Sequence, residues 1–311
     1  MNPLLGITLK VVSALAFTLM SAGLKTVSDR YPTGQIVFFR SFFALIPLLA
    51  WLAWRGNLVG AIRTNNVTGH CLRGFIGTFS MALSFSALAY LPLHDSIAIG
   101  YASPLIVVIM AALFLKEKIR IYRWSAVAVG FVGVMIMLSP FLGTSMMSRD
   151  TTATSTIGAG LALMGAVTGA GASIQVRRLT QTEETGAIVF YFSVMSAALG
   201  FGTILLGWKL PPLMDCALFV STGILGGVGQ ILLTQSYRHA DASIIAPFEY
   251  TTMIWAIVLG WFLFGDLPGW TVIAGGILVA AAGLFVVWRE HRLGLPRVKE
   301  LSASAQQRPG G

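Results

Sequence analysis

Residues 35–54 read QIVFFRSFFALIPLLAWLAW, a run of twenty residues with one charged side chain, Arg40. The hydrocarbon core of a bilayer is about 30 Å thick, and a helix needs roughly 20 mostly apolar residues to cross it. The run therefore predicts a membrane-spanning helix. It also places a guanidinium group among apolar side chains, where charge is costly and usually serves a function.

Nine further runs of similar length and composition occupy most of the 311 residues. Only 11% of the residues are charged and 56% are hydrophobic, whereas a typical soluble domain is roughly 25% charged. The sequence therefore predicts an all-α integral membrane protein with ten transmembrane helices. The predicted spans are Leu4–Leu24, Gln35–Trp54, Gly74–Leu93, Ile97–Leu115, Trp124–Phe141, Gly158–Gln175, Gly186–Gly207, Cys216–Gln235, Ser243–Phe264 and Trp270–Trp288.

The basic residues are divided unevenly between the two sides of these spans. With the N-terminus inside, fifteen Lys and Arg residues, Arg73 among them, fall on inner loops and the C-terminal tail, and four fall on outer loops. Cytoplasmic loops carry such an excess, so we expect both termini in the cytoplasm. The same bias explains the net charge of +9 without a nucleic-acid partner. We expect the basic tail, residues 289–311, to be disordered and to contact anionic lipid headgroups.

The two halves of the chain resemble each other. Residues 33–42 read TGQIVFFRSF and residues 185–194 read TGAIVFYFSV, which are identical at six of ten positions at a separation of 152. A separation of 149 relates two pairs of glycines, Gly74 and Gly77 in the first half and Gly223 and Gly226 in the second.

An odd number of spans in each half turns the second half over in the membrane. The pattern therefore predicts two inverted five-helix repeats, residues 4–141 and 158–288, joined by an outer linker over residues 142–157. Secondary transporters often have this architecture, with the substrate site near the midplane where the repeats meet.

These features resemble the drug/metabolite transporter superfamily, EamA type. The similarity rests on the ten spans, the repeat, the FFR string at residues 38–40, and spans four and nine that end near Glu117 and Asp266. It covers residues 4–288 and implies a carrier of small organic molecules in a bacterial inner membrane. Two departures from the pattern are Phe192, which stands where the first repeat has Arg40, and Asp266, where the family usually has Glu.

Residues 10–25, KVVSALAFTLMSAGLK, followed by residues 38–51, FFRSFFALIPLLAW, are most similar to a proteobacterial subgroup that includes riboflavin transporters and lies near amino-acid exporters and S-adenosylmethionine carriers. The resemblance therefore implies a secondary active transporter of riboflavin or a similar flat heterocycle. The alternatives are a broad exporter of amino acids or of aromatic and amphipathic compounds, and an S-adenosylmethionine carrier. We expect a monomer or a homodimer that contacts membrane lipids.

An integral membrane enzyme is less compatible with the sequence. Such enzymes usually place paired carboxylates, a His cluster or a Ser/His set at one membrane face. The four histidines, His70, His94, His239 and His291, are instead scattered over loops and span edges on both sides. We therefore expect no catalytic residues, no metal and no cofactor.

Two ionisable residues within the spans are candidates for transport. Arg40 could clamp a carboxylate, a phosphate or a ring carbonyl through its planar donors, or it could tie down backbone carbonyls near a helix break. Glu249 lies two residues after Pro247 and could couple transport to protons or pair with Arg40 or Lys10. The alternative is that Glu249 is solvated or salt-bridged at the membrane end. We expect Lys10 to snorkel to the headgroups.

The other candidates lie beside predicted helix breaks. Proline interrupts the helical hydrogen-bond ladder, and interrupted helices in corresponding spans of two repeats point to a binding site. In span four Pro104 follows Tyr101 and Ser103, and in span nine Tyr250 follows Glu249. Gln230, in the string GGVGQ, is a further polar candidate for contact with a heterocyclic substrate, although it could equally join helices.

Overall fold

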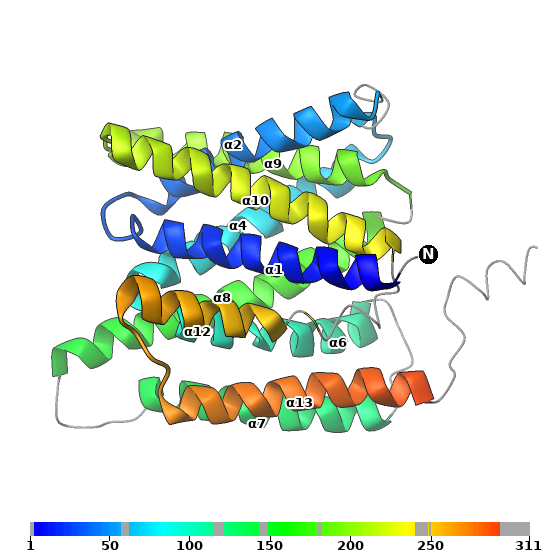
Figure 1. Ribbon diagram of the computed structural model, residues 1–311, viewed down its shortest axis with the longest axis vertical. Helices are drawn as coiled ribbons and strands as arrows, with labels where there is room; N and C mark the ends of the chain where they lie inside the picture. The colour runs from blue at the N-terminus through cyan, green and yellow to red at the C-terminus, as the bar shows by residue number, and fades with distance from the viewer. Residues whose placement is uncertain are drawn as a thin grey trace, which may run out of the picture.

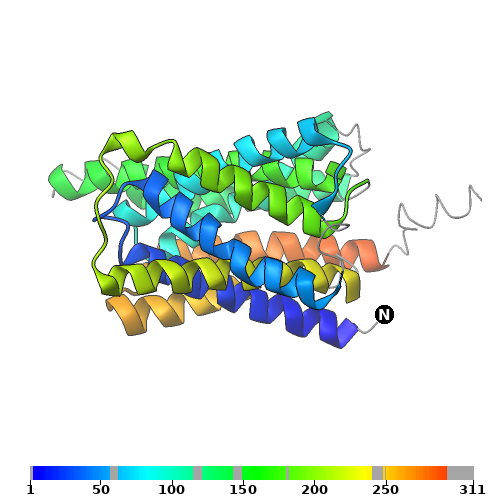
Figure 2. The same cartoon turned by 90° about the horizontal axis from the view of Figure 1, so that it is seen from above.

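The computed structural model describes residues 3–56, 62–114, 121–142, 149–179, 182–239, 248 and 250–292. Within these ranges the chain is helical and contains no strand. The long helices run roughly along one direction and form a bundle, which is seen from two sides in Figures 1 and 2.

Each of the ten predicted spans overlaps at least one described helix. The first half contains α1 (Pro3–Lys25), α2 (Thr33–Trp54), α4 (Val67–Tyr90), α5 (Leu93–Gly100), α6 (Ala102–Phe114) and α7 (Ile121–Leu142). The second half contains α8 (Arg149–Leu179), α9 (Thr185–Phe201), the short 3-10 helix η1 (Ile204–Leu206), α10 (Leu213–His239), α12 (Thr251–Phe264) and α13 (Trp270–Arg292). Span four is divided between α5 and α6, and α8 begins inside the segment that the sequence predicts as a linker.

Length and composition mark this chain as a multi-pass membrane protein. Among the described residues, five helical segments are long and apolar enough to cross a bilayer: Leu4–Lys25, Thr33–Trp54, Val67–Tyr90, Thr154–Val176 and Leu213–Leu233. Four shorter apolar segments lie in α7, α9, α12 and α13. The all-helical membrane class is therefore confirmed, while the number of ten crossings stays a prediction.

Local signals in the sequence set the helix ends. Asn66 precedes α4, and its side chain accepts a hydrogen bond of 2.9 Å from the backbone N–H of Gly69, which satisfies one of the free donors of the first turn. Helix α12 ends at Gly265, which has a φ of 71°. Glycine is the residue that adopts this left-handed conformation most readily at a helix C-terminus.

The break between α5 and α6 has a specific cause. Tyr101 separates the two helices, and Pro104 lies in the first turn of α6. Proline has no N–H to donate to the carbonyl four residues earlier, and its ring clashes with that carbonyl. The helix is therefore interrupted at residues 100–101, as Pro104 predicts.

The two halves pack against each other in matched pairs. Helix α1 contacts α10, and α8 contacts α4, so the first helix of each half packs against the third helix of the other half. Helix α2 contacts α9 and α10, and α7 packs against α13 at one edge of the bundle (Figure 1). The contact of α1 with α10 is therefore repeated by α8 with α4, with the helices of the two halves interchanged.

Individual residues repeat this exchange. A Cβ added at Gly74 would clash with Met195, and a Cβ added at Gly223 would clash with Phe43. Gly74 and Gly223 are matched at a separation of 149, and Phe43 and Met195 are matched at a separation of 152. Small residues allow helices to approach closely in membranes. The glycine pattern in the sequence thus corresponds to equivalent helix contacts in both halves.

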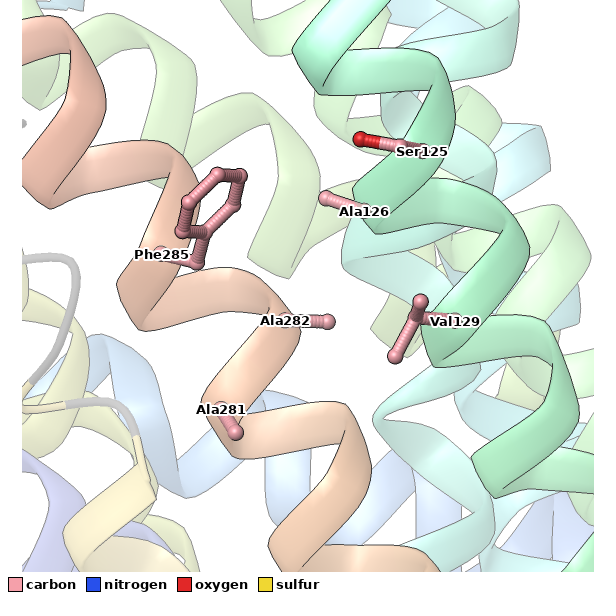
Figure 3. Close-up of a pocket in the computed structure, with 6 residues that line it drawn as sticks. All are labelled: Ser125, Ala126, Val129, Ala281, Ala282 and Phe285. Carbon is pink, nitrogen blue, oxygen red and sulfur yellow. The ribbon is translucent and has the colours of Figure 1, made fainter.

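Helices α7 and α13 also meet at glycines. A Cβ on Gly133 would lie 2.8 Å from the carbonyl oxygen of Gly275, and Met137 and Val279 beside them are fully buried. Farther along the same helix pair is a shallow, mostly apolar cavity of about 210 Å³ (Figure 3). Its lining residues are Ser125, Ala126, Val129, Ala281, Ala282 and Phe285.

Candidate functional site

Arg40 lies inside the bundle on α2. Arg40 is 6% exposed, and the neighbouring Ser41 is fully buried. A Cβ on Gly226 of α10 would lie 3.1 Å from the Arg40 Nε and 2.8 Å from the Met20 Sδ of α1. Because glycine has no side chain, position 226 leaves room for the Arg40 guanidinium group at the interface between the two halves.

The guanidinium group of Arg40 lacks partners among the described residues. Its Nε is buried and makes no hydrogen bond, and the ion pairs of the described part do not include Arg40. A buried donor without an acceptor costs about 1–3 kcal/mol, and more when it is charged. The described structure shows no bond from Arg40 to a backbone carbonyl, which the structural alternative requires.

A second arginine, partly buried in the bundle, was missed by sequence reasoning. Arg73 was counted with the cytoplasmic loop charges, but the structure places it within α4, so that assignment was wrong. Its Cζ lies 4.0 Å from the ring centroid of Phe192 on α9, close enough for a cation–π interaction. The Nε and Nη1 atoms are buried and have no hydrogen-bond partner among the described residues.

The position of Arg73 depends on a glycine one helical turn later. A Cβ added at Gly77 would collide with the Arg73 Nη1 and would lie 2.9 Å from the Phe192 ring. The sequence signal was therefore an arginine four residues before a glycine on the same helix face. It was obscured because His70 and Arg73 look like the polar end of a span.

The two guanidinium groups occupy matched places in the bundle. Gly77 and Gly226 are equivalent in the repeat, and Phe192 is the equivalent of Arg40. Arg40 therefore contacts Gly226 where α2 meets α10. At the equivalent place, where α9 meets α4, Phe192 contacts Gly77, and Arg73 stacks on the Phe192 ring. The helices that carry Arg40 and Arg73, α2 and α4, contact each other.

The tyrosines beside the helix breaks also come together. The ring centroids of Tyr101 and Tyr250 lie 5.4 Å apart in an edge arrangement, and the hydroxyl groups of Tyr101 and Thr252 are hydrogen-bonded. The Tyr250 hydroxyl lies against Gly283 of α13. Both rings belong to the hydrophobic cluster shared with α7 and α13, whereas Arg40 lies beside Met20 in a different cluster.

The remaining predicted site residues are less closely grouped. Ser103 is partly buried near Gly169 of α8, Pro104 is exposed, and Gln230 is partly buried one turn beyond Gly226. The structure thus brings Tyr101 and Tyr250 together, but no described contact joins them to Arg40.

Two charged candidates have different outcomes. Glu249 and the preceding Pro247 lie outside the described residues, so the coupling carboxylate stays a prediction. Lys10 is only 3% exposed. The expectation that Lys10 snorkels to the headgroups was therefore wrong, because its side chain is buried inside the bundle.

One end of the bundle carries a cluster that we call the Asp215 cluster: Arg30, Tyr31, Phe39, Asp215 and Phe219. The Tyr31 hydroxyl donates a hydrogen bond of 2.6 Å to the Asp215 Oδ2, and Arg30 donates one of 2.9 Å to the same oxygen. The Asp215 side chain is 6% exposed and the Arg30 side chain is 50% exposed. The bond to Asp215, together with burial, raises the pKa of Tyr31 above its ordinary value.

The opposite end carries the His70 cluster: Thr64, His70, Glu183 and Tyr191. The His70 Nε2 lies 3.3 Å from the Glu183 Oε2, and both side chains are buried. The His70 and Tyr191 rings pack with centroids 4.8 Å apart. Burial alone would raise the pKa of Glu183, but hydrogen bonds from Thr64 and His70 outweigh it and lower that pKa.

Within the described ranges, no three His, Cys, Asp or Glu residues come together in a way that could hold a metal ion. The second cavity, of about 250 Å³, lies beside Lys25, Asp29 and Phe264 near one end of the bundle. Neither described cavity includes a predicted site residue.

Comparison with known proteins shows the relationship of this chain. The EamA-like transporter family matches it twice, over residues 4–139 and 156–288. A pseudopaline exporter of Pseudomonas aeruginosa is 31% identical and is aligned over 89% of this chain and 94% of its own length. A riboflavin transporter of Rhizobium johnstonii is 28% identical over 91% and 90% of the two chains.

A third relative is an S-adenosylmethionine uptake transporter of Rickettsia bellii, which is 27% identical over 91% of this chain and 92% of its own. One crystal structure superimposes with a TM-score of 0.65 over 93% of this chain and 98% of that one, at 16% sequence identity. At that identity the likeness shows the fold alone.

Proposed function

The chain belongs to the EamA-like transporter family, and we propose that it is a secondary carrier that moves a small organic metabolite across a bacterial inner membrane by alternating access. Its relatives are named as transporters and not as enzymes. The chain is accordingly a metabolite transporter, and the proposal concerns its mechanism, orientation and substrate.

The observation that carries the proposal is the exchange of contacts between the two halves. Gly74 with Met195 and Gly223 with Phe43 make equivalent contacts, and the family matches each half separately. Two similar halves can exchange conformations at little energetic cost, which is the basis of alternating access in carriers built from inverted repeats. We place residues 4–141 and 158–288 in opposite orientations, with both termini in the cytoplasm.

The substrate proposal is a flat heterocycle such as riboflavin, with S-adenosylmethionine and a broad range of amphipathic or aromatic compounds as alternatives. Support comes from the neighbouring rings of Tyr101 and Tyr250 at the break between α5 and α6, because aromatic side chains stack on planar ligands. Arg40 would supply the polar contact, and Glu249 would couple transport to a proton gradient.

Reconstituted vesicles test the carrier mechanism. Purified protein in liposomes should take up labelled riboflavin or S-adenosylmethionine with saturable kinetics, and unlabelled compound inside the vesicles should accelerate uptake. Exchange of this kind is expected of a carrier whose site faces one side at a time. Uptake that rises linearly with concentration and ignores the internal compound would contradict the proposal.

Proton coupling has its own measurement in the same vesicles. An imposed pH gradient should drive accumulation by the wild-type protein, and Glu249→Gln should remove that dependence while exchange continues. An unchanged response of the Gln variant would exclude Glu249 as the coupling group.

A further inference from the structure

We propose that Arg40 and Arg73 together bind an anionic group of the substrate, a carboxylate or a phosphate. This inference rests on the carrier function proposed above and specifies the substrate class for that site. It starts from a feature that packing alone does not explain: Arg40 is buried, Arg73 is partly buried, and both have buried donor atoms without a hydrogen-bond partner among the described residues.

The surroundings of the two groups do not neutralise them. Arg40 lies beside Gly226 and Met20, and Arg73 lies beside Gly77 and Phe192. The carboxylates in the ion pairs of the described part belong to Asp215 with Arg30, Glu183 with His70, and Asp95 with His94. Within that part of the chain, Arg40 and Arg73 therefore have no countercharge.

Electrostatics favour an anion at this place. Two like charges in a medium of low dielectric constant repel each other more strongly than in water, and each guanidinium also loses hydration. An oxyanion held near both groups would offset these costs. Arginine suits carboxylate and phosphate because its planar fork can donate two parallel hydrogen bonds.

The placement of the arginines also suits a site that opens to each side in turn. Helices α2 and α4 contact each other and run in opposite directions (Figure 1). Arg40 lies seven residues beyond Thr33, and Arg73 lies six residues beyond Val67, which is about 10 Å into each helix at 1.5 Å per residue. The two arginines are thus supplied by helices that begin at opposite ends of the bundle.

A purely structural role makes a different prediction. If Arg73 only stacks on Phe192, its loss should lower stability without changing which ligands bind. Arg55 provides a matched control, because its Cζ lies 4.6 Å from the Trp51 ring centroid and its side chain is exposed at the end of α2. Arg55→Gln thus removes a stacked guanidinium from the surface and leaves Arg40 and Arg73 intact.

Matched ligand pairs test the anion requirement. We would measure dissociation constants of the purified full-length protein for riboflavin 5′-phosphate against riboflavin, and for S-adenosylmethionine against its carboxamide, in which a neutral amide replaces the carboxylate. The first member of each pair carries a phosphate or a carboxylate that the second lacks. At least one anionic member should bind the wild type ten-fold or more tightly than its counterpart.

Single substitutions test whether the preference for the anionic ligand depends on Arg40 and Arg73. Arg40→Gln and Arg73→Gln should each reduce the preference ten-fold or more, whereas Arg55→Gln should leave it unchanged. Equal binding within both pairs, no binding by either anion, or a preference that survives both Gln substitutions would overturn the inference.

A measurement on the wild type covers the case in which a variant fails to fold. Phenylglyoxal modifies arginine, and mass spectrometry locates the modified residues. The anionic ligand should slow modification of Arg40 and Arg73 but not of Arg55, and the neutral ligand should protect neither. Equal protection by both ligands, or none, would count against the anion site.

Flux in vesicles separates this inference from the proposed function. If a neutral compound is exchanged as fast as its anionic counterpart, the result supports the carrier function and contradicts the anion site. If the anion binds through both arginines but no exchange is seen, the result supports the anion site and contradicts the carrier function.

Discussion

Matched positions contact each other at the two ends of the bundle, but they carry different kinds of side chain. In the Asp215 cluster the rings of Phe39 and Phe219 stack with centroids 4.8 Å apart. In the His70 cluster Tyr191 and His70 pack at the same separation of 4.8 Å. Phe39 matches Tyr191 and Phe219 matches His70 at the repeat separations of 152 and 149.

A second matched pair shows the difference. Tyr31 and Phe219 make an edge contact between rings, with centroids 5.2 Å apart. The equivalent residues Glu183 and His70 form a hydrogen bond of 3.3 Å. The repeated fold therefore fixes where side chains meet but not what they are, and the two ends should respond differently to mutation and to pH.

The largest effect is expected for Asp215→Ala. It leaves the buried Tyr31 hydroxyl without its acceptor, which should lower stability by about 2 kcal/mol. The midpoint of thermal unfolding in detergent measures this loss. Asp215→Asn keeps an acceptor oxygen and should cost less. Equal losses for Ala and Asn would show that the charge, and not the bond to Tyr31, stabilises this end.

A smaller effect is expected for His70→Ala, which removes the contact with Tyr191 and one hydrogen bond to Glu183. We expect a loss of roughly 1–2 kcal/mol. His70→Phe retains a ring and reproduces the pair at Phe39 and Phe219, so it should lose less. If Phe costs as much as Ala, the hydrogen bond to Glu183 rather than the ring packing stabilises the His70 cluster.

The two ends should lose stability at opposite extremes of pH. The lowered pKa of Glu183 gives stability that is present above the ordinary carboxyl pKa of about 4.3 and is lost as pH falls through the folded value. The raised pKa of Tyr31 gives stability that is present below about pH 10 and is lost as pH rises through the folded value.

Unfolding midpoints measured over acid and alkaline buffers check both signs. Glu183→Gln should flatten only the acid side of the profile, and Tyr31→Phe only the alkaline side. A variant that flattens the opposite side would contradict the assignment of that cluster.

The smallest effect is expected for Arg30→Gln. Arg30 bonds to the same oxygen of Asp215 as Tyr31 does, but its side chain is 50% exposed. Exposed ion pairs contribute roughly 0–1 kcal/mol and weaken in salt, so the unfolding midpoint should barely move. A loss as large as that of Asp215→Ala would mean that the ion pair, not the tyrosine, dominates the cluster.

Much of the fold could be predicted because its signals are local. Apolar runs of the right length identified the helices, and Pro104 identified the break between α5 and α6 from the missing backbone donor. The glycines at 74 and 223 revealed the repeat, since close helix contacts restrict those positions to small residues.

The candidate site was harder to predict because its partners are distant in sequence. Arg40 stood out since apolar residues flank it, whereas Arg73 lies three residues after His70 and looked like part of a loop. Only packing reveals that Gly77 leaves room for Arg73 and that Phe192 lies beneath it. The pairing of His70 with Glu183 spans 113 residues and has no local signal.

The arginine pair has a consequence for rebuilding the protein from its parts. Arg40 and Arg73 both belong to the first half, and the equivalent positions of the second half are Phe192 and Thr222. A fusion of two first halves would bring four arginines to the interface, and a fusion of two second halves would bring none. The halves share a helix arrangement, but the charge at their interface makes each an unsuitable substitute for the other.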